Sequence, residues 1–388
     1  MVIYISNSFM IKDESIKNRD PYVSIAGQLR SKFVYDSLRN SCIDANFIVV
    51  NQGHGKNTGP YKTMKTKEDG VTFYTLGYKG RGFFRYFFSC ISTHFFLLRK
   101  AGLKDVLVCY NFRPELAIPI ITTRWIKKYK LVIQFEELYG ELPQCKYRLF
   151  GNFENFGIRT ADAFIVCSSE LEKRIRKANK NAQIVLSSGY PPTVKPRSTL
   201  NARNTTERLK ILYSGTLDKE RGVNRLLLAF QKTGLNAILY FTGDGPYKKV
   251  IESVSCSDER VKYLGVLPED EFEELIERID ICVNPQPPNS KFSKTSFPSK
   301  LINYLFHGKI VMSTKMKSVI NSKFGEYVYF YDDESNSSFE ETVLSIKNHI
   351  NEYQREAKNL PKTLEYIFEN DKIEISNLIK KITAKSSS

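Results

Sequence analysis

Short apolar runs alternate with longer helix-like segments along most of the chain, and the whole alternation occurs twice. In the first half the apolar runs lie at 2–6, 46–51, 71–76, 105–109, 131–135, 163–167 and 183–187. Helix-like segments lie between them at 28–39, 83–100, 115–127 and 170–178. Strands that alternate with helices predict a parallel sheet with helices on both faces.

A change of composition separates the two halves. Residues 188–208 are rich in Pro, Ser, Thr, Asn and Arg and have no periodicity, which predicts a linker. The alternation then restarts, with apolar runs at 209–214, 237–242, 261–264, 279–284, 310–313 and 327–331. Helix-like segments lie at 223–231, 246–253, 269–278, 298–306 and 339–350, and a polar amphipathic one lies at 360–383.

This pattern predicts an α/β fold of two Rossmann-like parallel-sheet domains in tandem, with a cleft between them. We expect an N-terminal domain at 1–190, a linker at 191–208, a C-terminal domain at 209–359 and a terminal helical segment at 360–388. Ligands of open α/β sheets bind beyond the carboxyl ends of the strands, so the loops there are the first candidates for a site.

Positive charge is concentrated in the first half of the chain. Residues 1–200 hold 31 Lys and Arg against 16 Asp and Glu, whereas the rest of the chain holds 27 against 26. We therefore expect the first half to meet an anionic membrane surface or a phosphorylated acceptor. No nucleic-acid-binding motif is recognisable, so no nucleic acid partner is predicted. The basic and aromatic stretch at 78–88 suits contact with anionic lipid, and it also suits a core helix with basic flanks.

The cysteines and the hydropathy favour a cytoplasmic protein. Seven cysteines are scattered without a C-x-x-C pair, which argues against a disulfide framework and against a zinc site. The longest apolar stretch, at 86–98, is shorter than the ~20 residues that a membrane-spanning helix needs. We expect no signal peptide, and peripheral contact with the inner face of the cell membrane.

Two segments of the second half have the chemistry of a phosphate site. In YSGTLDKERG, at 213–222, a buried strand runs into a glycine turn and Arg221 stands at the start of a helix. A cation at a helix N-terminus opposes the helix dipole unless an anion binds between them. The same holds for Lys300, which follows Pro298 and Ser299, because proline suits the first helical position. For both segments the alternative is a solvated cation on an ordinary loop.

Taken in order, five segments resemble the family-4 retaining glycosyltransferases of the bacterial surface-polysaccharide type. They are YSGTLDKERGV at 213–223, YFTGDGP at 240–246, VKYLG at 261–265, DICVNP at 280–285 and FPSKLINYLFHGKIV at 297–311. The resemblance implies the GT-B fold, in which the C-terminal domain holds most of the nucleotide sugar and the last helix returns to the first domain. It also implies a retaining transfer that needs no metal and no cofactor, and the chain has no D-x-D motif for a metal.

Residue by residue, the resemblance implies a donor site in the second half. Arg221 stands where the family has a lysine that binds the donor diphosphate. Thr216 replaces an arginine that is frequent in the family, and Lys300 is the candidate to supply that charge. The family's paired glutamates fall on Thr295 and Asn303, so the sugar contacts differ, and Asn303 is expected at a ribose hydroxyl. The expected donor-binding residues are Gly215, Thr216, Arg221, Gly243, Leu264, Gly265, Thr295, Ser299, Lys300 and Asn303.

The first half is expected to bind the acceptor. Ser24 and Gly27 follow the first strand and precede a helix, and Asn111 follows another strand. Glu136 and Glu137 end a third, where carboxylates can bind or deprotonate an acceptor hydroxyl. A plain turn and solvated charges are the alternatives. The expected catalytic residues are Glu136, Glu137, Arg221 and Lys300.

The predicted function is transfer of a sugar from a UDP or GDP sugar to a glycan or a polyprenyl-diphosphate-linked acceptor, in cell-surface polysaccharide synthesis. The alternative is a catalytically inactive GT-B partner or carbohydrate-binding subunit, because positions 216, 295 and 303 lack the family's usual residues. A nucleotide-sugar hydrolase or epimerase on the same fold is a third interpretation, since a fold does not determine one function.

Overall fold

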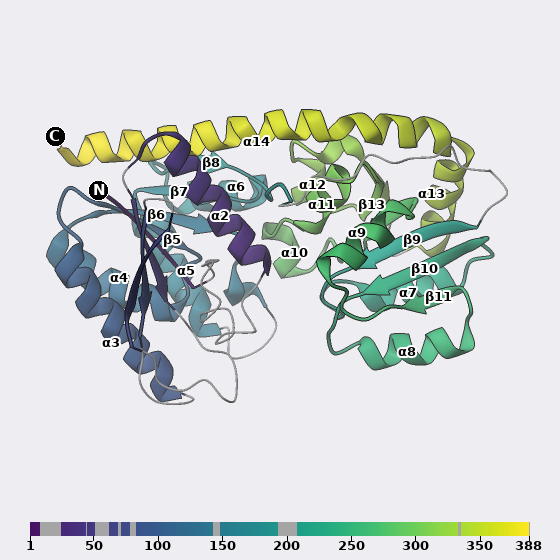
Figure 1. Cartoon of the computed structure of the whole chain (residues 1–388), viewed down its shortest axis with the longest axis horizontal. Coiled ribbons are helices and arrows are strands. Elements are labelled where there is room, and N and C mark those ends of the chain that lie inside the picture. The colour runs from purple at the N-terminus through teal and green to yellow at the C-terminus, as the bar shows by residue number, and fades with distance from the viewer. Residues whose placement is uncertain are drawn as a thin grey trace. The chain divides into compact units, whose positions relative to one another are not determined.

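The alternation of strands and helices produces two α/β units (Figure 1). The computed structural model describes residues 1–7, 25–43, 45–50, 62–68, 71–77, 83–142, 148–192, 208–332 and 335–387. Unit 1 consists of Met1–Tyr190 with Glu369–Ser388, and unit 2 consists of Pro191–Phe368. The expected fold class, an α/β protein with Rossmann-like parallel sheets, is confirmed.

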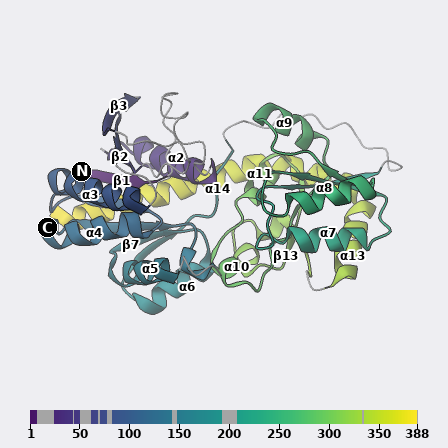
Figure 2. The ribbon, with the colours of Figure 1, turned by 90° about the horizontal axis from the view of Figure 1, so that it is seen from below.

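Unit 1 is built on an eight-stranded sheet in the order β3-β4-β2-β1-β5-β6-β7-β8. Its strands are β1 (Val2–Ser6), β2 (Ala45–Val50), β3 (Met64–Glu68), β4 (Val71–Leu76), β5 (Val106–Tyr110), β6 (Lys130–Phe135), β7 (Ala163–Val166) and β8 (Gln183–Leu186). Its helices are α2 (Ile25–Asn40), α3 (Phe83–Lys100), α4 (Pro114–Lys127), η1 (Tyr139–Glu141), α5 (Arg148–Thr160), α6 (Ser169–Ala178) and the end of α14 (Ile350–Ser387). In Figure 1 and Figure 2 alike, α3 lies beside α4.

One strand and one helix of unit 1 depart from the sequence prediction. β3 pairs antiparallel with β4 at the edge of a sheet that is otherwise parallel. Its sequence, MKTKE, places Lys65 and Lys67 in solvent, so it has no apolar run to reveal it. α5 contains two glycines, and Gly157 packs so closely that a Cβ there would lie 2.7 Å from the rings and methyl groups of Phe112 and Ile133.

Unit 2 is built on a six-stranded parallel sheet in the order β11-β10-β9-β12-β13-β14. Its strands are β9 (Leu209–Ser214), β10 (Ala237–Thr242), β11 (Val261–Tyr263), β12 (Ile281–Asn284), β13 (Ile310–Thr314) and β14 (Val328–Tyr331). Its helices are α7 (Val223–Gln231), α8 (Lys248–Ser257), α9 (Glu269–Glu277), α10 (Lys291–Thr295), α11 (Lys300–Phe306), α12 (Lys317–Ile320), η3 (Gly325–Tyr327), α13 (Asn336–Asn348) and the start of α14.

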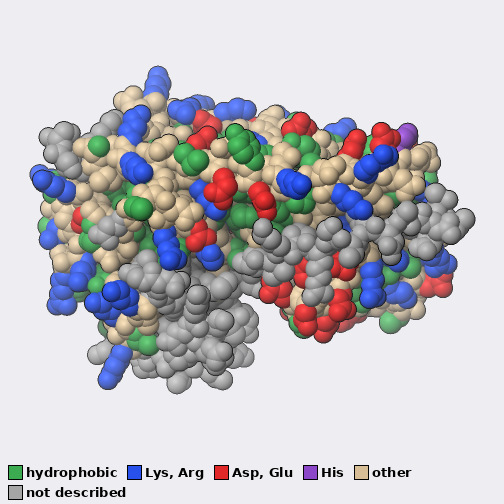
Figure 3. All heavy atoms as spheres, turned by 45° about the horizontal axis from the view of Figure 1, so that its top comes forward, with side chains coloured by type: hydrophobic (Ala, Val, Ile, Leu, Met, Phe, Trp, Pro, Cys, Tyr) green, Lys and Arg blue, Asp and Glu red, His purple; other side chains and the backbone are tan. Residues whose placement is uncertain are grey.

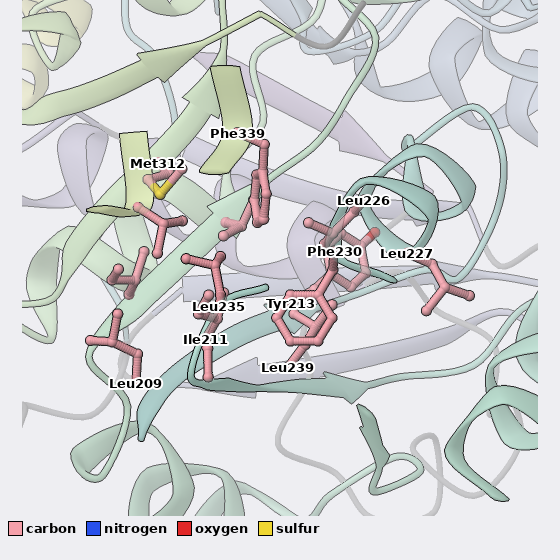
Figure 4. Close-up of a cluster of buried hydrophobic side chains, with 14 of the residues drawn as sticks. Leu209, Ile211, Tyr213, Leu226, Leu227, Phe230, Leu235, Leu239, Met312 and Phe339 are labelled. Atoms are coloured by element: carbon pink, nitrogen blue, oxygen red, sulfur yellow. The ribbon is translucent and has the colours of Figure 1, made fainter. Parts of the chain in front are cut away.

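The core of unit 2 explains why its strands are apolar without interruption. Ile211 and Tyr213 of β9, Leu239 of β10 and Phe230 of α7 are all buried in one cluster (Figure 4). Full burial of such a side chain contributes about 1.5–3 kcal/mol. A strand with helices on both faces buries successive side chains on opposite sides, so the alternation of apolar and polar residues disappears.

The order of the strands places a switch point in each sheet. In unit 2 the order runs outward from β9 in one direction and from β12 in the other. In unit 1 the equivalent neighbours are β1 and β5. The crevice beyond the carboxyl ends of such a strand pair is the ordinary ligand position in open α/β sheets. The loops after β9 and β12 are therefore the first place to look in unit 2.

Three further observations complete the fold. The last helix is longer than the predicted 360–383, because α14 begins at Ile350 and continues through Pro361. Within the described parts of the chain, no helix has both the length and the apolar character needed to cross a bilayer. On the face drawn in Figure 3, Lys and Arg side chains predominate on unit 1, whereas Asp and Glu side chains gather on unit 2.

Candidate functional site

The loop that follows β9 is held in shape by the loop that follows β10. Gly215 has a φ of 135°, and its N–H donates to the carbonyl oxygen of Thr242 at 3.0 Å. The Tyr213 hydroxyl donates to the carbonyl oxygen of Thr216 at 2.7 Å. A Cβ at Gly243, after β10, would lie 2.0 Å from the Gly215 carbonyl oxygen, so glycine is required for this close approach.

The next turn positions Arg221 at the start of α7. The backbone N–H of Arg221 donates to Asp218 Oδ1 at 2.7 Å. Gly222 then caps the helix with a φ of 77°, and a Cβ there would lie 1.8 Å from the carbonyl oxygen of Pro285, which follows β12. The Arg221 guanidinium lies over the ring of Phe292 in α10, 4.8 Å from its centroid. The start of α7 is therefore fixed against the chain that follows β12, at the switch point.

Lys300 enters the same place from α11. One turn further along this helix, the Tyr304 hydroxyl accepts the backbone N–H of Ser214 at 2.9 Å, which fixes α11 to the end of β9. The Lys300 ammonium lies over the ring of Tyr213, 3.8 Å from its centroid. A Cβ built on Gly215 would lie 3.2 Å from Lys300 Nζ. The two cations predicted from separate motifs thus lie close enough to interact, beside the Gly215 turn.

The electrostatics around Arg221 and Lys300 favour an anion. Burial and then the charge of Arg221 hold the pKa of Lys300 well below its usual value, and only Asp218 opposes them. Burial raises the pKa of Asp218 in turn, against the pull of Arg221 and Lys300. Burial of Lys300 and repulsion from Arg221 thus impose an electrostatic cost on the Lys300 ammonium. A bound anion such as a diphosphate would relieve it.

The residues at the family's glutamate positions lie on α10 and α11. Thr295 ends α10 and is buried. Asn303 lies in α11 and, among the described atoms, its buried side-chain oxygen Oδ1 has no hydrogen-bond partner. Ser299 immediately precedes α11, which begins at Lys300 rather than at the predicted Pro298. A buried amide oxygen without a donor is unfavourable, so a donor that reached Asn303 Oδ1 would stabilise it.

The loops after β10 and β11 form the remaining wall. The N–H of Gly243 donates to the carbonyl oxygen of Gly265 at 2.7 Å, and the Tyr263 hydroxyl donates to the Gly243 carbonyl oxygen at 2.9 Å. Leu264 is partly exposed. No atom lies within 4 Å of a Cβ built on Gly265, so open space adjoins this backbone.

The residues predicted to bind the acceptor lie in unit 1, and two of them bond to each other. Ser24 lies outside the described residues, and Gly27 lies in the first turns of α2. Asn111 is buried, with a φ of 47°, and its Oδ1 accepts the backbone N–H of Glu136 at 2.9 Å. Glu137 follows at the end of β6 and is half-buried.

Sequence reasoning missed the partner of Glu136. Arg30, fully buried in α2, donates from Nε to Glu136 Oε1 at 2.6 Å. It also donates to the carbonyl oxygens of Ser187 and Gly189, both at 2.7 Å. No sequence signal links residues 106 positions apart. The Glu136 carboxylate therefore holds a buried cation, whereas sequence reasoning considered it as an acceptor ligand or a solvated charge.

Tyr213 and Asp218 were also absent from the predicted set. A sequence signal exists for Asp218, because an aspartate side chain in a turn commonly accepts the N–H of a residue shortly after it, as Asp218 does from Arg221. Tyr213 carries no such signal, because it lies within the apolar run of β9 and is predicted only as a core residue. Its contact with Lys300 appears only when α11 is placed against β9.

Comparison with known proteins agrees with this geometry. Residues 199–363 match the sequence model of the family described as glycosyl transferases group 1. No curated protein sequence matches the chain. Among solved structures, sucrose-phosphate synthase from Thermosynechococcus elongatus superimposes with a TM-score of 0.72 at 13% identity, over 99% of both chains.

Two further structures hold nucleotides. The Anabaena HepE protein in complex with UDP-glucose matches with a TM-score of 0.66 at 11% identity, over 99% of both chains. The catalytic domain of starch synthase IV from Arabidopsis thaliana, bound to ADP and acarbose, matches with a TM-score of 0.66 at 11% identity, over 96% of this chain and 99% of that one. The fold is GT-B. The GT-B likeness covers nearly the whole chain and shows the fold, whereas the group 1 match covers the part that contains Arg221 and Lys300.

Proposed function

We propose that this GT-B protein is a retaining, metal-independent glycosyltransferase that uses a UDP or GDP sugar. The observation that carries the proposal is the meeting of Arg221 and Lys300 beside the Gly215 turn at the switch point of unit 2. A nucleoside diphosphate would bring further negative charge to these two cations. HepE holds UDP-glucose and the starch synthase domain holds ADP, so nucleotides of this class suit the same fold.

The proposed chemistry is electrostatic. The bond between the anomeric carbon and the diphosphate oxygen breaks, and the nucleoside diphosphate leaves with the electron pair. Arg221 and Lys300 stabilise the charge that develops on this leaving group, which lowers the barrier without a metal. The acceptor hydroxyl forms its bond to the anomeric carbon on the same face and loses its proton. The resemblance to retaining enzymes supports this stereochemistry.

The remaining donor contacts follow from the loops of unit 2. The backbone of Gly215, Thr216 and Gly243 would line the phosphates, and the open space at Gly265 beside Leu264 would take the base. Asn303 Oδ1 would accept a hydrogen bond from a ribose hydroxyl. Ser299 and Thr295 would face the sugar in place of the family's acidic residue.

The acceptor is proposed to bind unit 1. Gly27, Asn111, Glu136 and Glu137 all lie beyond the carboxyl ends of β1, β5 and β6. Arg30 engages Glu136, and the half-buried Glu137 beside it is proposed to bind an acceptor hydroxyl or receive its proton. A glycan or a polyprenyl-diphosphate-linked glycan is the proposed acceptor, used in cell-surface polysaccharide synthesis. The excess of basic residues in unit 1 supports contact with the anionic inner face of the cell membrane.

One observation favours a second candidate, a catalytically inactive carbohydrate-binding or partner subunit. Thr295 and Asn303 provide no carboxylate where the family has its paired glutamates. Such a protein would keep the fold and lack transfer activity. Failure to bind any nucleotide sugar would favour it. Turnover of a nucleotide sugar without acceptor would instead favour a hydrolase or epimerase.

The test is replacement of Arg221 by alanine, with Arg225→Ala as the matched control. Arg225 is an exposed arginine of the same helix, α7. We expect Arg221→Ala to lower turnover by orders of magnitude while its circular dichroism spectrum is unchanged, and we expect Arg225→Ala to keep its activity. Near-normal turnover in Arg221→Ala would overturn the assignment.

A further inference from the structure

α3 buries polar side chains and exposes apolar ones, which is the opposite of an ordinary surface helix. Its polar residues Ser89 and Thr93 are buried, whereas aromatic and aliphatic residues at spacings of three and four face solvent. Phe84 is 64% exposed and Phe95 is 55% exposed. The exposed apolar residues are Phe84, Phe87, Phe88, Ile91 and Phe95. An apolar stripe of this extent on a soluble surface marks an interaction site.

The apolar surface continues from α3 onto α4 and α5. Ile118, Trp125 and Ile126 of α4 are exposed, and Trp125 is 80% exposed. Leu149 at the start of α5 is 58% exposed. Since α3 lies beside α4 in both views (Figure 1, Figure 2) and α4 packs on α5, these residues form one surface, which we call the α3–α5 face.

A pocket of about 760 Å³ opens in the α3–α5 face. Phe87, Ile91 and Phe95 line it from α3, and Ile118, Leu149 and Phe150 line it from α4 and α5. Two pairs of its polar groups lie close together: Arg113 Nε is 2.7 Å from Glu115 Oε1, and His94 Nδ1 is 2.8 Å from Thr122 Oγ1. The pocket therefore offers mainly apolar contact to a guest.

The charges around this face have one sign. α3 contains no acidic residue, and the only acidic residues of α4 and α5 are Glu115 and Glu154, both buried. Glu154 accepts the backbone N–H groups of Tyr139 and Gly140 at 2.7 and 3.1 Å. The exposed charged residues of these helices are Arg99, Lys100, Arg148 and Arg159, and Lys128 follows directly after α4. Every exposed charge described here is thus positive, which complements anionic lipid headgroups.

We infer that the α3–α5 face docks on an anionic bilayer and that its pocket takes a hydrocarbon chain from that bilayer. Exposed aromatic rings and a basic rim are the composition of an interfacial membrane site. The inference deepens the proposed function by giving unit 1 a defined lipid-binding site. It rests on the proposed function only for the reason why the protein would bind a membrane, not for the binding itself. Vesicle binding and nucleotide binding are separate measurements, so either can fail alone.

The chain supplies its own probe, because Trp125 is its single tryptophan and lies on this face. The experiment records Trp125 emission of the full chain with vesicles of 30% phosphatidylglycerol in phosphatidylcholine, with vesicles of phosphatidylcholine alone, and with lipids brominated in their acyl chains. We expect a blue shift with the anionic vesicles and quenching by the brominated chains. We expect little change with phosphatidylcholine alone.

The variant Phe87→Asp/Phe95→Asp should weaken binding to anionic vesicles at least tenfold. Leu228→Asp/Ile320→Asp is the matched control, because both residues are exposed apolar side chains of unit 2 and the charge change is equal. Both variants should keep their unfolding temperature and their stabilisation by nucleotide.

Three results would overturn the inference. One is the absence of vesicle binding. The second is vesicle binding without quenching by brominated chains, which would show that Trp125 does not enter the acyl region and that binding is due to surface electrostatics alone. The third is a dimer in solution that Phe87→Asp/Phe95→Asp dissociates, which would make a second copy of the chain the occupant. Vesicle binding without any nucleotide binding would overturn the proposed function and leave the lipid site intact.

Discussion

Replacement of Lys300 by methionine should change stability and nucleotide affinity in opposite directions. Methionine keeps an unbranched side chain over the Tyr213 ring and removes the charge that lies near Arg221. Burial disfavours the Lys300 ammonium and Arg221 repels it, so an apolar side chain avoids both costs, while Arg221 remains beside Asp218. The free variant should therefore unfold at the same temperature as the wild type or higher.

The loss should appear when nucleotide is added. A hydrogen bond to a charged group contributes about 1.5–3 kcal/mol, so loss of the Lys300 contact should weaken nucleotide binding about 10- to 150-fold. At 100 times its Kd, a nucleotide stabilises the wild type by about 2.7 kcal/mol. The same concentration would stabilise a variant with thirtyfold weaker binding by only about 0.9 kcal/mol.

Differential scanning calorimetry with and without nucleotide measures both effects, and pH adds a second check. Because the pKa of Lys300 lies well below 10.5, the ammonium loses its proton earlier than an exposed lysine as pH rises. Nucleotide affinity should therefore fall at alkaline pH in the wild type, and it should stay level in Lys300→Arg. Between the two pKa values the unfolded chain binds more protons, so the free protein gains stability as pH rises. A destabilised Lys300→Met with an unchanged response to nucleotide would refute the reasoning and make Lys300 a structural cation.

Three further predictions concern stability. Gly222→Ala should destabilise unit 2 by about 2–5 kcal/mol in urea unfolding, because it combines a left-handed φ with an overlapping carbonyl oxygen, whereas Gly234→Ala, with no atom within 4 Å, should not. Arg30→Met should cost about 3–5 kcal/mol, and Arg30→Met/Glu136→Met should cost less because no unpaired carboxylate remains; an equal loss would contradict the ion pair. Burial raises the pKa of Glu154 from 4.5 to about 7, so stability should fall by roughly 3 kcal/mol between those pH values, and Glu154→Gln should flatten this slope; a slope unchanged by the variant would assign it to other groups.

The sheets were predictable because their strands are buried on both faces. The apolar runs at 2–6, 209–214 and 237–242 coincide with β1, β9 and β10. β3 was not predictable, because an edge strand with alternating lysines has no apolar run. α5 was missed because its glycines oppose helix formation, and its stability comes from packing of Gly157 that only the folded chain creates. α14 was predicted too short, since it begins at Ile350 and continues through Pro361.

Some residues of the candidate site were predictable from the sequence and others were not. Arg221 and Lys300 were found from local signals, each a cation at a helix start, and the structure brings them together beside Gly215. Tyr213 and Arg30 were missed because their partners are distant in sequence. Arg30 also changes the role expected for Glu136. A carboxylate that pairs with a buried guanidinium is poorly available to an acceptor.

Nucleotide binding tests the central claim most directly. Isothermal titration of the full chain with UDP, GDP and their sugars, without added metal, compares the wild type with Arg221→Ala. The account predicts binding of one nucleotide class to the wild type and a loss of that binding of at least tenfold in Arg221→Ala. The absence of binding by every nucleotide, or equal binding by both proteins, would contradict a donor site at Arg221 and Lys300.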